Sequence, residues 1–354
     1  MNMHLEKIKK NLPEGVDGVL ITNNRNQRWA SGVLFHDGYL LITKKESYLL
    51  TDSRYIEMAE NEARDLTVMQ MSGQRKQMFL ELCEKNDVKT LAFEDVWTTV
   101  SAYEGLKKTF EGVELVPAGR LLEELREYKD EEEIENIIAA QRIAEQAFDH
   151  ILGFISPDKT EIDVALELEF FMRAHGAEGL SFDTIAVSGK ASALPHGVPR
   201  PVKLEKGFFT MDYGCVYKGY CSDMTRTVVI GKADEDMKLL YNTVLNAQVS
   251  AEEAIVEGVT GGALDKIARD FIDGSKFKGC FGHSLGHGVG MYIHEEPRLS
   301  PACDRVLECG HVVTVEPGIY LEGKYGCRIE DMVAIKDDGT IHNFTNSPKG
   351  LIEI

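Results

Sequence analysis

Acidic residues placed in pairs within apolar strands are the first sign of chemistry in this sequence. Asp212 and Asp223 lie in residues 207–231, a stretch whose β-branched and aromatic residues predict a β-hairpin. If the turn is centred between Tyr217 and Lys218, the two aspartates oppose each other with their Cβ atoms about 5 Å apart. Because two uncompensated carboxylates between apolar strands are costly, we expect a divalent cation between them.

A second pair of acids follows the same pattern further along the chain. Residues 313–331 predict another, wider hairpin. A centre at Gly323 places Glu316 opposite Glu330. Two hairpins therefore each offer a facing pair of carboxylates.

A glycine-rich stretch, residues 282–290, lies between the two hairpins and carries His283 and His287. On a helix, this HxxxH spacing would place both imidazoles on one face as zinc ligands. The four glycines of the stretch disfavour a helix, since each costs about 1 kcal/mol relative to alanine. We expect an extended or looping backbone held close to a site, in which at most one histidine need be a ligand.

Two aspartates, two glutamates and one neutral histidine form a ligand set dominated by hard oxygen atoms. Such a set is predicted to hold two divalent ions, whose four positive charges balance the four carboxylates. We expect Mn²⁺ first, with Co²⁺ or catalytic Zn²⁺ as alternatives. Two ions roughly 3.5–4 Å apart can share a bridging water and lower its pKa to about 7, which makes hydroxide available as a nucleophile at neutral pH.

Two domains are expected to position these residues, divided at residues 122/123. The first is predicted as an α/β unit, and its expected elements are strands 18–22, 38–43, 47–51 and 88–93, helices 54–64 and 74–85, and a polar turn at 23–26. The second is predicted to begin with a charged helical stretch, 121–128, and a helix capped by Asp130. Its other expected elements are helices 160–175, 234–257 and 264–272 and strands 184–188, 312–316 and 328–335.

Composition narrows the class of protein. The chain has 354 residues, of which 43% are hydrophobic and 27% charged, as in ordinary soluble globular proteins. A net charge of −19 disfavours binding to nucleic acid or to an anionic membrane. We expect a cytoplasmic protein, because there is no membrane-length apolar run, no signal peptide and no CxxC pair among seven cysteines. No glycine-rich nucleotide motif is present.

Several motifs resemble the signature of the pita-bread metallopeptidases. They are DYG, GYCSDMTRT, HSLGHGVG, HEEP, VEPGIY and RIED. Within that group they resemble the proline-specific members, Xaa-Pro dipeptidase (prolidase) and aminopeptidase P. The likeness covers residues 125–345, and weaker matches lie at 26–32 and 51–55. It implies an α/β creatinase-like N-terminal domain (1–122), followed by an α+β pita-bread catalytic domain (123–354) with a curved, mainly antiparallel sheet, and a homodimer.

The resemblance also implies roles for individual residues. The implied metal ligands are Asp212, Asp223, His287, Glu316 and Glu330. The implied catalytic residues are Glu316, which handles the proton of the attacking water, His294, which stabilises the oxyanion, and His196. The implied substrate-binding residues are His196, His283, His294, Tyr320 and Arg328. Thr225 is expected to bond a ligating carboxylate, and Arg328 to share the face of Glu330 and neutralise it.

Three cysteines depart from the expected pattern: Cys215, Cys221 and Cys327. Cys221 is expected near the site if its strand is regular, because it would then share a face with Asp223. An oxidation-sensitive site would follow, although no ligand is put in doubt.

The function implied is a dinuclear-metal peptidase that hydrolyses the bond before proline in a dipeptide. The first alternative is an aminopeptidase P acting on longer peptides, and the sequence does not choose between them. A catalytically inactive peptide-binding module on the same fold is the second alternative. It is disfavoured, as is a metal-free C–N hydrolase resembling creatinase, because all five ligands are present.

Overall fold

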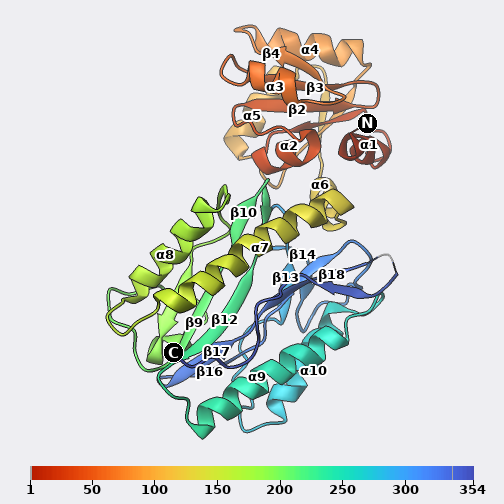
Figure 1. Cartoon of the computed structure of the whole chain (residues 1–354). Helices are drawn as coiled ribbons and strands as arrows, with labels where there is room; N and C mark the ends of the chain where they lie inside the picture. The colour runs from red at the N-terminus through yellow and green to blue at the C-terminus, as the bar shows by residue number, and fades with distance from the viewer. Residues whose placement is uncertain (1, 337) are drawn as a thin grey trace. The chain divides into compact units, whose positions relative to one another are not determined.

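The computed structural model describes residues 2–336 and 338–354, and the chain folds as two compact units, Met1–Arg126 and Glu127–Ile354 (Figure 1). The first unit is α/β and the second contains antiparallel sheets with two pairs of helices. The division falls near the end of α6 (Leu121–Glu127).

The N-terminal unit is built on a six-stranded mixed sheet with the strand order β4-β3-β2-β1-β5-β6. The strands are β1 (Gly18–Ile21), β2 (Gly38–Thr43), β3 (Ser47–Thr51), β4 (Thr67–Gln70), β5 (Thr90–Phe93) and β6 (Glu114–Pro117). Strand β2 pairs antiparallel with β1 and with β3, which confirms the predicted hairpin, and the other pairings are parallel.

The remaining helices of this unit are α1 (Met3–Lys10), α2 (Asn24–Ser31), α3 (Ile56–Glu62), α4 (Arg75–Lys85) and α5 (Val100–Thr109). The polar turn predicted at 23–26 is wrong, because helix α2 begins there. Asn23 is its N-cap, and its side chain accepts hydrogen bonds from the backbone N–H groups of Arg25 and Asn26. Burial of Trp29 and Ala30 anchors this short polar helix.

The strands of the C-terminal unit pair antiparallel in every ladder between named strands. The sheets have the orders β12-β9-β8, β14-β13-β15-β18-β19, β11-β10-β7 and β16-β17. The strands are β7 (Gly179–Leu180), β8 (Ile185–Ser188), β9 (Gly207–Tyr213), β10 (Cys215–Tyr217), β11 (Tyr220–Cys221), β12 (Met224–Ile230), β13 (Gly286–Gly288), β14 (Glu295–Leu299), β15 (Val312–Val315), β16 (Gly318–Leu321), β17 (Tyr325–Arg328), β18 (Asp331–Ile335) and β19 (Ile341–Asn343).

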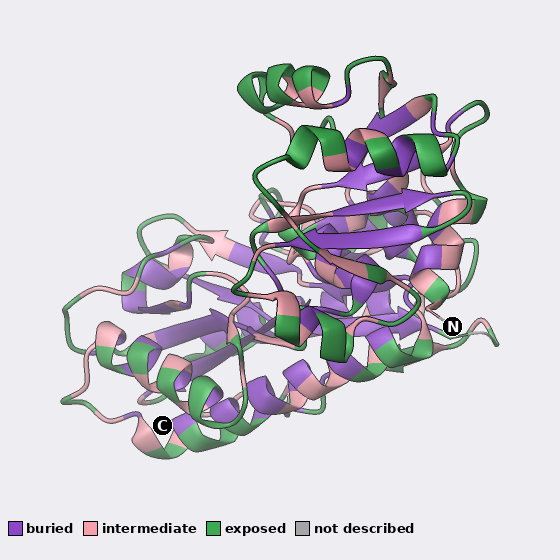
Figure 2. Ribbon diagram, turned by 90° about the horizontal axis from the view of Figure 1, so that it is seen from above, coloured by how far each residue is buried: buried purple, intermediate pink, exposed green. Residues whose placement is uncertain are grey.

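Two pairs of helices flank these strands: α7 (Glu131–Phe154) with α8 (Glu161–Ala174), and α9 (Glu235–Glu253) with α10 (Gly261–Asp273) (Figure 1). Each pair shares an apolar core with the strands beneath it. A short 3₁₀ helix, η1 (Gly189–Ala193), follows β8. In Figure 2 the strands are mostly buried, whereas the helices carry exposed residues on their outer sides.

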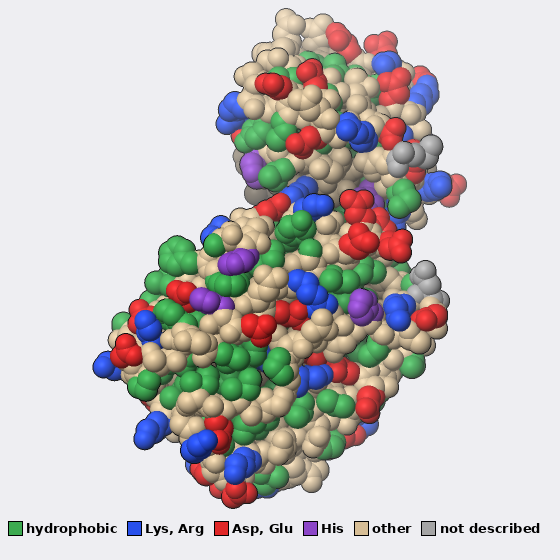
Figure 3. Space-filling model, in the orientation of Figure 1, with side chains coloured by type: hydrophobic (Ala, Val, Ile, Leu, Met, Phe, Trp, Pro, Cys, Tyr) green, Lys and Arg blue, Asp and Glu red, His purple; other side chains and the backbone are tan. Residues whose placement is uncertain are grey.

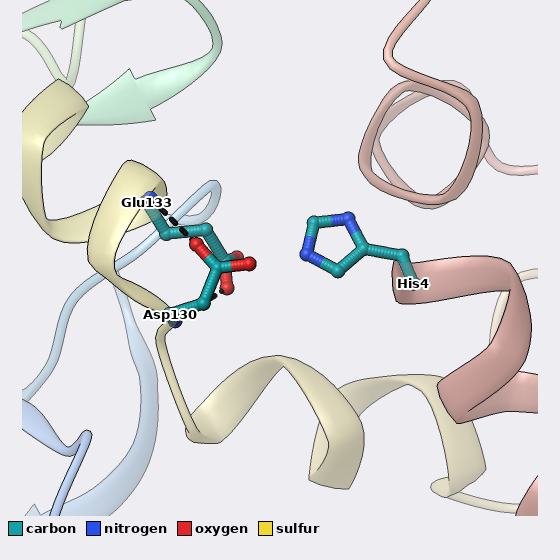
Figure 4. Close-up of side chains that lie close together, drawn as sticks. All are labelled: His4, Asp130 and Glu133. Carbon is teal, nitrogen blue, oxygen red and sulfur yellow. Dashed lines mark hydrogen bonds between the residues drawn. The ribbon is translucent and has the colours of Figure 1, made fainter. Parts of the chain in front are cut away.

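Helix α7 begins at the predicted cap. The side chain of Asp130 accepts a hydrogen bond from the backbone N–H of Glu133, and the Glu133 carboxylate accepts one from the backbone N–H of Asp130 (Figure 4). This capping box satisfies two N–H groups that the helix cannot pair internally.

Acidic and basic side chains are interspersed on the molecular face drawn in Figure 3. Among the described residues, no helix combines the length and the apolar character needed to cross a membrane.

Candidate metal centre

The first hairpin presents its two aspartates in a register that differs from the prediction. Its turn residues are Lys218 and Gly219, both with positive φ (46° and 88°), so the turn lies one residue later than expected. Asp212 therefore pairs with Thr225, and Asp223 does not lie directly opposite Asp212. A shift of two residues in pairing keeps every side chain on its original face, since side chains alternate with period two.

The second hairpin has the predicted register. Val315 pairs with Asp331, and Gly318 pairs with Arg328. Glu316 lies between β15 and β16, and Glu330 lies between β17 and β18. The two glutamates therefore lie opposite each other, as expected.

The histidine-bearing stretch is extended, as predicted, and forms the short strand β13. A Cβ added at Gly286 would lie 2.0 Å from the backbone oxygen of Thr314, so the absence of a side chain lets the two strands approach. The backbone N–H of Glu316 donates to the backbone oxygen of Leu285 (2.8 Å), which fixes the second hairpin against this stretch.

Side chains from all three stretches converge. Ligand atoms of Asp223, His287 and Glu330 all lie within 4.8 Å of one another. His287 Nε2 lies 3.4 Å from Glu316 Oε1 and 3.6 Å from Asp223 Oδ2. The fifth predicted ligand, Asp212, lines the same cavity.

The tautomer of His287 shows that this cluster fits a cation. His287 Nδ1 lies 3.1 Å from the backbone oxygen of Gly288, which can only accept, so Nδ1 carries the proton. Nε2 therefore presents its lone pair to two carboxylates. A lone pair that faces carboxylates at these distances is repulsive when the carboxylates are ionised, and a cation bound between them removes this repulsion.

Asp212 gives a second sign of fit. Its Oδ2 accepts a hydrogen bond from Arg328 Nη2 (2.5 Å), whereas its buried Oδ1 has no partner among the described residues. A buried carboxylate oxygen without a donor is costly, and a metal ion would satisfy it.

The electrostatics of the cluster agree with this reading. Burial, and next the charge of Glu330, raise the pKa of the Asp223 carboxyl well above its usual range. Burial, and next the charge of Glu316, raise the pKa of Glu330 in the same direction. Burial raises the pKa of Glu316 to about 8, although Arg328 opposes this shift. Burial, and next His294, lower the pKa of His287 to about 3, so this imidazole is neutral and able to bind metal.

Arg328 organises the groups around the ligands. Its charge opposes the raised pKa of Glu330, in line with the predicted neutralisation, and its directly hydrogen-bonded carboxylate is Asp212. Its Nε donates to Thr225 Oγ1 (3.1 Å), and Thr225 Oγ1 donates to Glu330 Oε2 (2.7 Å), as expected for Thr225. One guanidinium thus holds two ligands, one directly and one through a hydroxyl.

A second chain of hydrogen bonds leads from Arg328 to His283. Arg328 Nη1 donates to the Tyr320 hydroxyl (2.7 Å), which donates to His283 Nε2 (2.9 Å). His283 Nδ1 donates to the backbone oxygen of Ser284 (2.8 Å). Burial, and next Arg328, lower the pKa of His283 to about 4, so the chain ends on a neutral imidazole.

The cluster lies in a cavity of about 800 Å³ within the C-terminal unit. His196, His283, His294 and Arg328 line it with the five predicted ligands. Tyr320 contacts both His283 and Arg328 from behind this lining. Cys221 is not part of the lining, and its Sγ faces the backbone oxygen of Met291 (3.7 Å).

Sequence reasoning missed Arg298, which also lines the cavity. Its side chain is 43% exposed, and its nearest recorded acid, Glu296, lies 4.0 Å away. It directly follows HEEP, four residues after His294, and this even spacing could have drawn attention to it, because alternate residues of a strand share a face.

Comparison with known proteins gives the same picture. Residues 135–337 match the model of metallopeptidase family M24, and residues 5–128 match the Creatinase/Prolidase N-terminal domain. An Xaa-Pro dipeptidase of Pyrococcus horikoshii is 37% identical over 96% of this chain and 97% of its own length.

Solved structures agree over nearly the whole chain. An Xaa-Pro dipeptidase from Bacillus anthracis superposes with a TM-score of 0.95 at 41% identity, covering 99% of both chains. An X-Pro aminopeptidase from Thermotoga maritima superposes with a TM-score of 0.92 at 36% identity, covering 96% of this chain and 98% of its own.

The fold and the site define a pita-bread metallopeptidase with a creatinase-like N-terminal domain. The chain belongs to metallopeptidase family M24, and it is a peptide hydrolase of the Xaa-Pro dipeptidase and aminopeptidase type.

Proposed function

We propose that the protein is a dinuclear-metal Xaa-Pro dipeptidase, in which Asp212, Asp223, His287, Glu316 and Glu330 hold two divalent ions. The observation that carries this proposal is the lone pair of His287 Nε2 facing the carboxylates of Glu316 and Asp223. Mn²⁺ is proposed as the metal, because hard carboxylate oxygens dominate the donor set.

The bound ions supply a water of lowered pKa and polarise the scissile carbonyl. The chain's own groups do the rest. The Glu316 carboxylate is placed in the cavity to accept the proton of the attacking water and return it to the leaving nitrogen. His294 lies with its ring centroid 4.3 Å from that of His287 and can donate a hydrogen bond to the carbonyl oxygen as charge develops.

Substrate size is the finer part of the proposal. Arg328 already donates hydrogen bonds to four groups: Asp212, Thr225, Tyr320 and the backbone oxygen of Pro195. Few of its N–H groups therefore remain for a ligand. Arg298 places a guanidinium in the cavity, and its ion pair with Glu296 is long, 4.0 Å from Nε to Oε1. A positive charge within reach of the reaction centre suits the carboxylate that ends a dipeptide.

Aminopeptidase P activity is the second candidate. The cavity of about 800 Å³ exceeds what a dipeptide fills, which leaves room for a residue after proline.

The test measures kcat and KM of the purified protein with Mn²⁺ on Ala-Pro and on Ala-Pro-Ala. We expect faster hydrolysis of Ala-Pro, and an Arg298→Gln variant that raises KM about tenfold for Ala-Pro and less for Ala-Pro-Ala. Arg298→Lys is the matched control that keeps the charge. Faster hydrolysis of Ala-Pro-Ala would establish the second candidate, and no hydrolysis of either peptide with Mn²⁺, Co²⁺ or Zn²⁺ would defeat both.

The homodimer implied by the family resemblance is likewise a proposal. Light scattering on the same preparation tests it, and the mass of a single chain would contradict it.

A further inference from the structure

The N-terminal unit contains a crevice of about 620 Å³ at one edge of its sheet, which we call the N-terminal crevice. Its lining includes Thr22, Asp52 and Met71, which directly follow β1, β3 and β4, and residues 97–99, in the loop that follows β5. These parallel strands therefore all end at the crevice. The strand order reverses beside β1, since β2 to β4 lie on one side of it and β5 and β6 on the other. In open α/β sheets, ligands bind at this edge and at such a reversal.

Helix α5 borders the crevice without filling it. Ala102, Gly105, Leu106 and Thr109 line the crevice along one side of α5, yet no residue of this ten-residue helix is buried. Gly105 lies in the helix interior, where glycine is unfavourable relative to alanine. A Cβ at this position would meet nothing within 4 Å, so close packing does not explain the glycine. The sequence leaves open a space that a larger side chain could occupy.

Two acids and two arginines line the crevice, and only one of the arginines is bonded to the acids. Arg54 Nη2 bonds both Asp37 (2.6 Å) and Asp52 (2.5 Å), so two carboxylates share one guanidinium. Arg75 donates to the Tyr39 hydroxyl (3.0 Å), and no acid is recorded in an ion pair with Arg75 within residues 2–336 and 338–354. A ligand carrying one positive and one negative charge complements this arrangement better than a simple anion.

Aromatic side chains line the rest of the crevice. Phe79 packs edge-on against Tyr39 with ring centroids 5.3 Å apart, and Phe110 lies 5.0 Å from Phe79. Phe79 and Phe110 are each 1% exposed, so they support the crevice from beneath and leave little surface to a ligand. Trp97, which is 42% exposed, adds a further aromatic surface. Aromatic rings gain from pairing with another ring beyond the area that they bury.

We propose that the N-terminal crevice binds a free amino acid with an aromatic side chain. Its carboxylate bonds Arg75, its ammonium group bonds the Asp37–Asp52 pair, and its ring packs on Trp97, the exposed aromatic residue of the lining. All of these residues belong to the N-terminal unit, so the proposal does not depend on the metal centre.

The test titrates the full-length, metal-loaded protein with L-phenylalanine, using calorimetry and tryptophan fluorescence. Trp97 lines the crevice, whereas Trp29, the second tryptophan, is buried outside this lining. We expect a saturable signal, with N-acetyl-L-phenylalanine and phenethylamine each binding at least about tenfold more weakly, because each lacks one of the two charges. Equal binding of either analogue, or no saturation by about 10 mM L-phenylalanine, would overturn the proposal.

Four variants locate the binding. Gly105→Leu fills the crevice and Arg75→Gln removes the carboxylate partner, so each is expected to weaken binding at least about tenfold. Gly105→Ala is the matched control that should keep binding and raise Tm, because alanine favours the helix. Glu330→Gln should leave phenylalanine binding unchanged. Binding that is lost in Glu330→Gln but kept in Gly105→Leu would place the ligand at the metal centre and reject the proposal.

Discussion

Glu330 and Asp331 are adjacent acids at the beginning of β18, and their surroundings are opposite. The Glu330 carboxylate faces the metal-centre acids and accepts a hydrogen bond from Thr225. The Asp331 carboxylate faces the other side of the strand and lies 2.7 Å from both Arg226 Nη2 and Lys349 Nζ. Thr225 and Arg226 are likewise adjacent on β12, and the backbone N–H of Glu330 donates to the backbone oxygen of Thr225 (3.2 Å), so β12 and β18 each present one residue to each side.

On the side of Asp331, cationic side chains of the protein compensate the charge of the carboxylate. Although burial alone would raise the pKa of Asp331, Arg226 and Lys349 lower it to about 2. Lys349 also pairs with Glu252 (2.9 Å). Arg226, whose side chain is 1% exposed, further donates to the backbone oxygen of Glu330 (2.7 Å). The chain here supplies cations from its own side chains, which makes the cluster structural.

The side with Glu330 gathers four carboxylates around one hydrogen-bonded guanidinium, Arg328, and burial raises the pKa of Glu330. The comparison teaches that burial of acids does not by itself indicate a metal site. A deficit of the chain's own cations, together with a neutral imidazole aimed at the acids, distinguishes the metal centre from the structural cluster.

The largest effect is expected from Glu330→Gln. Loss of a charged ligand weakens metal binding, so kcat on Ala-Pro should fall about a thousandfold or more. The metal-free variant should be at least as stable as the metal-free wild type, because a buried uncompensated acid is gone. Kinetics, metal content per chain and thermal melts measure these outcomes. Glu322→Gln, an exposed acid on the turn of the same hairpin, is the control, and near-wild-type turnover of Glu330→Gln would contradict the ligand assignment.

Asp331→Asn should produce the opposite pattern. Removing this carboxylate leaves Arg226 and Lys349 with less compensation in a buried site, so the free energy of unfolding should fall by about 3 kcal/mol. Denaturant unfolding measures the change, with the exposed Asp304→Asn as control. An unchanged stability would show that the two sides of the strand do not differ as described.

Removal of metal should destabilise the protein more at pH 8 than at pH 6. The folded-state pKa values of Glu316, Asp223 and Glu330 are raised, so the metal-free folded chain binds more protons than the unfolded chain between about pH 4.5 and 8. The stability that these acids contribute is therefore present at low pH and lost as pH rises through about 8, the value for Glu316. Bound cations replace the protons, so the fall in Tm on adding EDTA should be larger at pH 8 by about 2–4 °C. An equal fall at both pH values would contradict this account.

The smallest effect is expected from Thr225→Val. The variant removes the hydroxyl that joins Arg328 to Glu330 and should weaken metal affinity about tenfold with little change in Tm. Metal titration followed by activity measures it. Thr243→Val is the control, because that hydroxyl bonds only the backbone of its own helix among the recorded contacts. An unchanged metal affinity in Thr225→Val would show that the Thr225 hydroxyl does not support metal binding.

Local pattern predicted much of the site. Glycine content excluded a helix for the stretch around His287, and the turn centred on Gly323 gave the register of the second hairpin. The turn at Lys218–Gly219 was misplaced by one residue, so Asp212 pairs with Thr225 instead of Asp223. Both aspartates still reach one centre because the resulting shift of two residues preserves the strand face.

The sequence by itself determined which residue types are present and, through the two-residue period of strands, which of them share a face. The tertiary structure alone decided what each charge meets. It paired Arg328 with Asp212, placed Arg298 in the cavity and joined Lys349 to Asp331. The physical reason is that charge compensation acts over a few ångströms in space, and the compensating groups come from segments whose separation along the chain carries no local signal.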